Sequence, residues 1–380
     1  MDDKRAVCSF EGHQLPMKRT EIAKLKEIAL GVWSEPGIGR NHSEWEELIP
    51  YRRLVGDLIS TEGAEVKPKP EHLLFTEGTG ETVEMLLRTL AAPGDYVLLE
   101  QPADDGMISS CKRLGLLIAA ADSDGEGIDA EQAERLIVRH RPRLMLAMPD
   151  FRNPTGRSWS LARRRKVLQL CLAYGVTIVE HDLYGHTGFQ SDYRQVYPSL
   201  LALAMGHSGE RPTIVQVGSL TDTLAPVVRS AWIASPDEHM LAALHDARQG
   251  GVDTIAQTIA YRYLKQVIVQ HGLEQAALDR RKRLMAMDRE LRRANMTDLN
   301  WTLPEGGIYL WLELPEGLDA DALLRASRMK GVTFHPGASC YVHRGKRNTA
   351  RLNFAAHSAR VNASGIQRLM EAIAEFTARR

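Results

Sequence analysis

Short apolar runs alternate with longer amphipathic segments through the middle of this sequence, and this alternation restricts the fold more than any other feature. Seven short runs have the composition of strands, at residues 73–76, 96–100, 116–120, 144–148, 177–180, 214–217 and 228–234. Several are apolar throughout, as strands covered on both faces of a sheet must be. The segments between them have helical spacing, for example 82–90, 130–139 and 161–174. The pattern predicts an α/β fold with a mostly parallel sheet.

The pattern changes from about residue 255 onward. A long charged helix is expected near 274–294, then strands at 307–314, 331–334 and 351–354, and a final helix at 363–378. We therefore expect a large α/β domain over residues 51–270 and a smaller α+β domain over residues 271–380. The first 50 residues carry few strong signals, and we expect them to pack against both domains.

Composition and charge exclude several classes of protein. Lysine plus arginine and aspartate plus glutamate both number 48, so net charge gives no reason to expect nucleic acid or an anionic membrane as partner. The four cysteines are scattered without a CxxC pair, which argues against a disulfide framework or a zinc ribbon. No signal-peptide pattern and no apolar window of about 18 residues is present. These features predict a soluble cytoplasmic protein.

A glycine-containing turn follows the first predicted strand. Gly78, Thr79 and Gly80 stand between that strand and a predicted helix. Free amides at a helix N-terminus favour an anion, and glycine allows a phosphate group to approach closely. The segment is therefore either a phosphate-binding turn or an ordinary tight connection between a strand and a helix.

A second turn carries a more specific signal. Asn153-Pro154-Thr155-Gly156 follows a buried strand, and at this distance from the first turn it resembles the NPTG motif of the fold-type-I PLP-dependent (pyridoxal-phosphate-dependent) aminotransferases of class I/II. Further segments resemble motifs of that family in the same order, at 93–97, 218–229, 304–307, 336–337 and 351–355. The resemblance covers nearly the whole chain. It implies a large domain with a mostly parallel, seven-stranded sheet, a smaller α+β domain and a homodimer.

The resemblance also implies roles for individual residues. Asn153 and Tyr184 match the residues that hydrogen-bond the phenolic oxygen of the cofactor. Ser219 and Arg229 match phosphate ligands, and a charge-assisted arginine contact suits a phosphate. Arg351 matches the arginine that binds the substrate carboxylate through two parallel hydrogen bonds. A small carboxylate is therefore the expected substrate.

Three positions depart from the family pattern. The lysine that holds PLP as a Schiff base falls on Asp222, seven residues before Arg229, and a carboxylate cannot form that bond. The aspartate that pairs with the pyridine nitrogen falls on His181, although a one-residue slip would restore Asp182. The aromatic residue that stacks on the ring falls on Asp104. Covalently bound PLP is therefore not expected.

The altered positions are expected to face one cleft together with the N-terminal segment. Gly12 and His13 fall where related proteins have two glycines near the substrate. We therefore expect His13, Asp104, His181 and Asp222 to lie around the same ligand.

Four functions are compatible with such a cleft. The first is an enzyme that acts on an amino acid or an amino-acid-derived carboxylate by acid–base chemistry, with Asp222, His181 and Tyr184 as catalytic residues. The second is a metal-dependent enzyme with His13, His181 and Asp222 as ligands. The third binds PLP or pyridoxamine phosphate (PMP) non-covalently, and the fourth is a non-catalytic binding protein. The fold alone does not choose among them.

Overall fold

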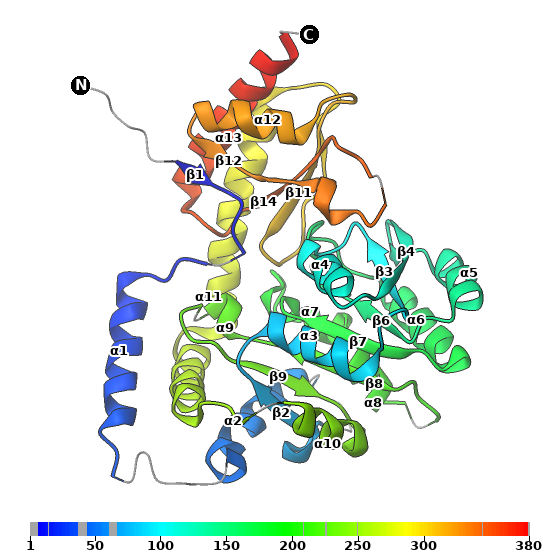
Figure 1. The fold of residues 1–380 in the computed structure, drawn as a ribbon. Helices are drawn as coiled ribbons and strands as arrows, with labels where there is room; N and C mark the ends of the chain where they lie inside the picture. The colour runs from blue at the N-terminus through cyan, green and yellow to red at the C-terminus, as the bar shows by residue number, and fades with distance from the viewer. Residues whose placement is uncertain are drawn as a thin grey trace.

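The computed structural model describes residues 7–13, 15–36, 44–60, 67–207, 209–224, 226–248, 250–343 and 345–378, without the side chains of 44, 45, 47, 222, 223 and 269–272. Its centre is an eight-stranded sheet with the order β2-β9-β8-β7-β6-β3-β4-β5 (Figure 1). The strands of this large sheet are β2 (Leu73–Thr76), β3 (Tyr96–Gln101), β4 (Leu117–Asp124), β5 (Gly127–Ile128), β6 (Leu144–Ala147), β7 (Thr177–Asp182), β8 (Ile214–Gly218) and β9 (Ala231–Ala234).

The large sheet confirms the predicted fold class. The pairs β4–β3, β3–β6, β6–β7 and β7–β8 are parallel, and β9 runs antiparallel to both of its neighbours. All seven predicted strands form. The eighth, β5, is a two-residue strand that folds back on β4 as a hairpin, and it was too short to be recognised from sequence.

Helices cover both faces of the large sheet. One face packs against α3 (Thr79–Leu90), α4 (Asp105–Arg113) and α10 (Glu238–Ala247). The other face packs against α2 (Glu44–Ile59), α5 (Ala130–His140), α6 (Leu161–Tyr174) and α8 (Leu200–Met205). Successive strand residues point to opposite faces, so Leu74 joins the first of these two cores and Phe75 joins the second. This double coverage explains why the strands are apolar throughout.

The longest helix connects the large sheet to the rest of the molecule. Helix α11 (Thr254–Ala294) begins at Asp253, whose carboxylate accepts hydrogen bonds from two backbone amides, and ends at Asn295 in a left-handed conformation. The predicted start at residue 274 was wrong by 20 residues, because Gly272 interrupts the helical pattern and glycine is a poor helix former. The expected boundary between residues 270 and 271 falls inside α11. The division into domains stays a prediction.

A four-stranded antiparallel sheet forms the smaller part, in the order β10-β11-β14-β13. Its strands are β10 (Asn300–Trp301), β11 (Tyr309–Glu313), β14 (Thr349–Asn353) and β13 (His335–Pro336), and its helices are α12 (Ala320–Met329) and α13 (Ala359–Ala378). The prediction that 331–334 joins this sheet was wrong. Strand β12 (Val332–Thr333) instead pairs in parallel with β1 (Cys8–Ser9), so the N-terminal segment supplies its partner.

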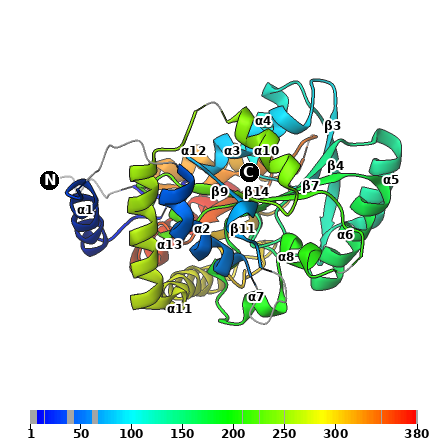
Figure 2. The same ribbon diagram turned by 90° about the horizontal axis from the view of Figure 1, so that it is seen from below.

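The N-terminal segment also contains a helix that was not predicted. Helix α1 (Arg19–Trp33) packs against α11 and lies at the periphery of the molecule in both ribbon views (Figures 1 and 2). Only Leu25 and Val32 of α1 are buried, so this helix makes few core contacts with the rest of the chain. None of the described helices is both long and apolar enough to cross a membrane.

Candidate active site

A cavity of about 390 Å³ lies beside the carboxyl ends of β3, β6 and β7. Ligands of open α/β sheets bind at this edge of the sheet. The cavity is lined by His13, Thr79, Gly80, Val83, Asp104, Asp105, Gly106, Met107, Ser110, Asn153, His181, Leu183 and Tyr184. It therefore brings together most of the residues that the sequence singled out.

His181 is a buried polar residue of this cavity whose ring forms no hydrogen bond with the described residues. Its side chain is 7% exposed, and neither ring nitrogen has a hydrogen-bond partner among the described residues. Burial lowers the pKa of His181 to about 4, although the nearby carboxylate of Asp104 acts in the opposite direction. The imidazole is therefore neutral near pH 7, with one nitrogen free to accept a proton.

Asp182 is held away from the cavity by other residues. Its carboxylate forms an ion pair with Arg194 and accepts a hydrogen bond of 3.1 Å from the backbone amide of Gly185. Asp182 does not line the cavity, whereas His181 does. The structure therefore places His181, and not Asp182, at the cavity, and the match of His181 to the family's ring-nitrogen position stays a prediction.

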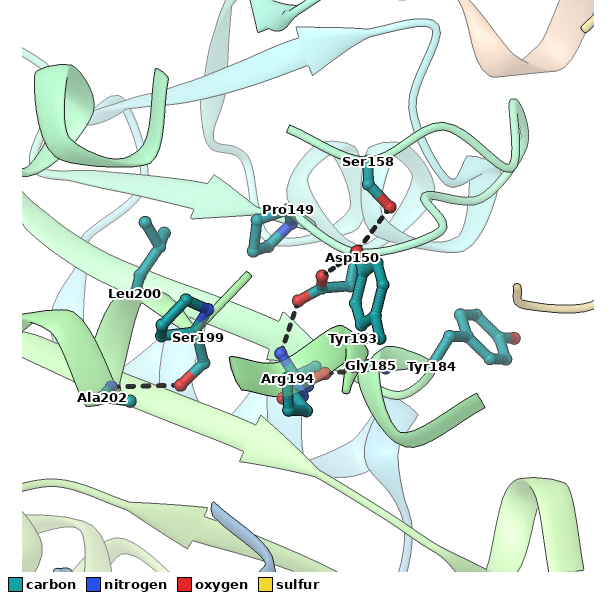
Figure 3. Close-up of polar contacts among 12 residues, drawn as sticks. Pro149, Asp150, Ser158, Tyr184, Gly185, Tyr193, Arg194, Ser199, Leu200 and Ala202 are labelled. Carbon is teal, nitrogen blue, oxygen red and sulfur yellow. Dashed lines mark hydrogen bonds and ion pairs between the residues drawn. The ribbon is translucent and has the colours of Figure 1, made fainter. Parts of the chain in front are cut away.

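A buried ion cluster fixes the segment that follows β7 (Figure 3). Asp150 accepts hydrogen bonds from Arg164 and from the hydroxyl of Tyr193, both at 2.6 Å, and from Arg194 at 2.8 Å. Burial alone would raise the pKa of Asp150, but the two guanidinium groups lower it to about 2. Because Arg194 also binds Asp182, the cluster ties the end of β7 to the turn after β6.

Three polar side chains form a chain of contacts at one end of the cavity. The hydroxyls of Tyr184 and Tyr309 lie 3.4 Å apart, and a 2.8 Å hydrogen bond joins Tyr309 to Nδ1 of His13. Burial and the neighbouring Arg351 guanidinium lower the pKa of His13. Tyr309 was not predicted from the sequence, where its only signal is its place two residues after Gly307.

Arg351 lies behind this chain and is fully buried in β14. Its Nη1 donates to Oδ1 of Asn153 at 2.7 Å and its Nη2 donates to the carbonyl of Glu11 at 3.2 Å. The guanidinium lies over the Tyr309 ring, 4.8 Å from its centroid, and 3.8 Å from the Asp105 carboxylate. Its Nε has no hydrogen-bond partner among the described residues. Arg351 is therefore held rigidly and keeps one unused donor.

Asp104 and Gly12, two other residues predicted for the site, form hydrogen bonds within the protein. Asp104 caps helix α4 by accepting a 3.0 Å hydrogen bond from the Met107 amide, and it also accepts one from the side-chain amide of Asn153. The carbonyl of Gly12 accepts a 2.8 Å hydrogen bond from Asn353, although Gly12 itself does not line the cavity. The capping role explains why an acidic residue is tolerated at position 104.

A second cavity, of about 670 Å³, lies at the N-terminus of α3. Its lining comprises Gly78, Thr79, Gly80, Glu81, Glu84, Ser110, Arg113, Pro226, Val227, Val228, Arg229 and Ser230. Arg229 donates to the carbonyl of Glu77 at 3.0 Å and forms an ion pair with Glu81. Ser219 does not line this cavity, because its buried hydroxyl donates to the carbonyl of Ser230 at 2.8 Å. An anion bound here would compete with Glu81 for Arg229.

Position 222 belongs to the short helix α9 (Thr221–Leu224), but the side chain of Asp222 is outside the described part of the structure. Its predicted catalytic role, and the predicted metal site of His13, His181 and Asp222, therefore stay predictions. Neither cavity is lined by a lysine side chain among those that the structure describes.

The large sheet with its site at the strand ends, and the small sheet that supplies a buried arginine, define a fold-type-I transferase. Residues 41–369 match the family model described as aminotransferase class I and II. The chain belongs to this family.

Its relatives include proteins named as transaminases. The chain is 30% identical to the 2-aminoadipate transaminase of Thermus thermophilus over 98% of this chain and 91% of that protein. It is 27% identical to aromatic-amino-acid aminotransferase 1 of Thermococcus litoralis over 80% of this chain and 72% of that protein. The crystal structure of the T. thermophilus α-aminoadipate aminotransferase, complexed with N-(5'-phosphopyridoxyl)-L-leucine, superposes with a TM-score of 0.89 and 28% identity, covering 99% of this chain and 94% of that chain.

Proposed function

We propose that this protein is an aminotransferase-family enzyme that binds an amino acid or an amino-acid-derived carboxylate and moves a proton with His181, without covalently bound PLP. One observation carries the proposal. His181 is a buried, neutral imidazole in the cavity, and neither of its nitrogens has a partner among the described residues. An unsatisfied buried polar group costs on the order of 1–3 kcal/mol. A ligand that hydrogen-bonds the ring would remove that cost.

Arg351 is the proposed anchor for the carboxylate. Its contacts with Asn153 and Tyr309 hold the guanidinium in one orientation, which lowers the entropy lost when a ligand binds. Asp105 lies 3.8 Å from Nη1, which is too far for a hydrogen bond, and Nε has no hydrogen-bond partner among the described residues, so the guanidinium charge is not fully paired. Because Arg351 is fully buried and does not line the cavity, neighbouring side chains would have to move for a carboxylate to reach it. A carboxylate bound there would lie in the same site as His13.

The bound carboxylate would also adjust the acidity of His181. A base with a pKa of about 4 is weak, because general bases work best when their pKa lies near the working pH. Negative charge close to an imidazole favours its protonated form and raises its pKa. Asp104 already acts in this direction, and a ligand carboxylate would add to it. Ligand binding would therefore move His181 toward the range in which it accepts and returns a proton.

The residues around His181 do not fit a covalently held PLP ring. The family's lysine position carries Asp222, and a carboxylate cannot form a Schiff base. A neutral imidazole holds the ring-nitrogen proton less well than an aspartate, and Asp104 cannot stack on an aromatic ring. We therefore assign the proton transfer to the chain's own side chains. A role for Asp222 and Tyr184 as further acid–base groups belongs to the same proposal.

A second candidate function is non-covalent binding of PLP or PMP. The cavity at the start of α3 favours it, because Thr79 and Gly80 at the helix N-terminus and Arg229 line the same cavity, and a helix N-terminus favours an anion. The ion pair between Arg229 and Glu81 opposes it. The transaminase names of the relatives favour a bound cofactor as well.

Spectroscopy and native mass of the untagged protein test the cofactor part of the proposal. We expect no visible absorption band that borohydride removes, and a native mass without PLP. A borohydride-sensitive band would overturn the absence of covalent PLP. A mass increase of one PLP or PMP that is lost on denaturation would instead support the second candidate.

Deuterium exchange tests the proton transfer without knowledge of the product. A panel of 2-amino and 2-oxo acids, including 2-aminoadipate, is incubated with the protein in D₂O, and deuterium gained at carbon is measured by mass spectrometry. We expect exchange with at least one acid, and a loss of about 10²–10⁴-fold in His181→Asn. The exposed His245 provides the control variant His245→Asn, which should exchange as the wild type does. Equal exchange in the wild type and in His181→Asn would overturn the role of His181.

A further inference from the structure

A cysteine, a histidine and an aspartate meet beside the cavity, although the sequence analysis assigned a role to none of them. Asp105 is the first residue of α4, His335 lies on β13, and Cys340 ends the short 3-10 helix η3 (Gly337–Cys340). Each offers one ligand atom, and these three atoms all lie within 4.8 Å of one another. Among the described residues, no other group of three such side chains is gathered this closely.

We propose that Asp105, His335 and Cys340 form a binding site for one divalent cation of the zinc type. The three donors are oxygen, nitrogen and sulfur, a mixed set that suits a borderline-soft metal better than magnesium or calcium. Three protein ligands leave a fourth position open in a tetrahedral site, as in catalytic zinc sites.

The distances fit such a site after small movements. Zinc binds nitrogen and oxygen at about 2.0–2.2 Å and sulfur at about 2.3 Å, so its tetrahedral ligand atoms lie roughly 3.3–3.7 Å apart. Nε2 of His335 and Oδ2 of Asp105 are already 3.4 Å apart. The upper limit of 4.8 Å for the remaining pairs leaves an adjustment of about 1 Å. We expect rotations of the half-buried His335 and Asp105 side chains to supply this movement.

The backbone around the cluster is fixed in place. The amide of Ala103 donates to the carbonyl of Cys340 at 2.7 Å, which joins the segment before α4 to η3. His335 pairs with Arg351 across β13 and β14. The hydroxyl of Ser339 lies 3.0 Å from Nε2 of His335 and would give up this contact to the metal. A site with a rigid backbone loses little entropy when the metal binds.

Arg351 is a cation beside the cluster, and its position is compatible with a metal. Its Nη1 lies 3.8 Å from Oδ1 of Asp105, whereas His335 faces Oδ2, so the two oxygens can serve the arginine and the metal separately. Asp105 also lines the main cavity. Asp105 is therefore shared between this cluster and the lining of the main cavity. This site differs from the predicted metal triad of His13, His181 and Asp222.

Metal titration of the untagged full-length protein tests the proposal. We expect one Zn²⁺ per chain by elemental analysis after dialysis, and an increase in Tm on Zn²⁺ addition to the metal-free protein. Substitution with Co²⁺ should give a thiolate-to-cobalt charge-transfer band in the near ultraviolet. A wild-type protein that binds neither ion in stoichiometric amount would overturn the site.

Variants identify the ligands. Cys340→Ala should lose the charge-transfer band, whereas Cys171→Ala, which removes another buried thiol in α6, should keep it. His335→Gln should weaken Zn²⁺ binding by at least about 100-fold, since even the loss of an indirect supporting contact costs roughly 10–100-fold. His335 is partly exposed, so this variant tests the site even where Cys340→Ala does not fold. A band that persists in Cys340→Ala, or unchanged affinity in His335→Gln, would show that other residues hold the metal.

Discussion

Arg351 and Asn153 are joined by a hydrogen bond of 2.7 Å, from Nη1 of the guanidinium to Oδ1 of the amide. Arg351 belongs to β14 of the small sheet, and Asn153 follows β6 of the large sheet, so the contact links the two sheets at the cavity. The amide nitrogen of the same Asn153 side chain donates to Asp104. The orientation of Arg351 and the cap of α4 therefore depend on one amide group.

Arg351→Ala should weaken the binding of a carboxylate ligand far more than Arg347→Ala. A desolvated, charge-assisted contact contributes on the order of 2–5 kcal/mol to binding. Arg347 lies four residues away on the surface, where its side chain is 64% exposed and pairs with Asp319, and so provides the matched control. Isothermal titration with 2-aminoadipate and 2-oxoglutarate measures the affinities. Equal affinity in both variants would contradict the proposed carboxylate site.

The Asp150 cluster should contribute strongly to stability. Removal of one partner from a buried ion pair typically costs about 3–5 kcal/mol, and Asp150→Asn leaves Arg164 with no full counter-charge. The surface pair of Lys67 and Asp57 provides the control, because Asp57→Asn changes the same charge at a residue whose side chain is 69% exposed. Urea unfolding at pH 7 measures both variants. A difference below about 1 kcal/mol between them would contradict the assigned role.

The same cluster predicts how stability depends on pH. The pKa of Asp150 is about 2 in the folded protein and about 3.9 in an unfolded chain, so the folded pKa is lowered. Its contribution, about 2–3 kcal/mol, is complete above pH 4 and is lost as the pH falls from about 4 to about 2. The difference in unfolding free energy between wild type and Asp150→Asn should shrink over this range. A constant difference from pH 5 to pH 2 would rule out the ionised carboxylate as its source.

Helix α1 should belong to a subunit interface. The family resemblance implies a homodimer, and α1 exposes Ile22, Leu30 and Trp33, whose side chains are 51%, 58% and 59% exposed. Light scattering at micromolar concentration should give the mass of a dimer, and Trp33→Glu should increase the monomer fraction. Val138 is also 58% exposed but lies on α5, so Val138→Glu should leave the dimer intact. A monomeric wild type would contradict this expectation.

Much of the fold could be predicted from the sequence, because in the large sheet the local residue patterns agree with the way the strands and helices pack. Strand β2 and helix α6 begin and end at the predicted residues, since buried strands are apolar on both faces and Ser160 and Gly175 provide clear helix ends. Two of the errors, in α2 and α11, lie where a residue type opposes the helix that forms. Helix α2 contains Pro50, and α11 continues through Gly272, two residue types that disfavour a helix interior.

The candidate site was predicted in part. His13, Asp104 and His181, which were expected to share one cleft, line one cavity together with Asn153 and Tyr184, whereas the side chain of Asp222, also expected there, lies outside the described part of the structure. The sequence did not predict that Glu81 pairs with Arg229, or that Asp105 lies near His335 and Cys340. These contacts join residues that are far apart in the chain. Such contacts depend on how the two sheets are placed, which no local pattern encodes.

Restoring the lysine alone should not produce an efficient transaminase. In Asp222→Lys a new amine would stand seven residues before Arg229, which matches the spacing of the family's lysine, and we expect it to react with added PLP. The ring nitrogen would still face His181, whose pKa of about 4 makes it a poor partner for a protonated ring nitrogen at pH 7, and Asp104 would still cap α4 instead of stacking. Each loss of about 1.36 kcal/mol of transition-state stabilisation lowers the reaction rate about tenfold.

The gain in transamination rate in the double variant Asp222→Lys with His181→Asp should therefore exceed the sum of the gains in the two single variants. Both residues would act on the same bound ring, so their effects are coupled. The assay is amino transfer to 2-oxoglutarate from a panel of amino acids with added PLP, and the exposed Asp246 provides the charge-matched control Asp246→Lys. If the rate gains of the two single variants simply add in the double variant, the two residues do not act on the same PLP ring. Ordinary transaminase rates in the wild type would contradict the proposal that the protein works without covalently bound PLP. Such rates would require either that a lysine distant in the sequence enters the site or that the register between Ser219 and Arg229 is different.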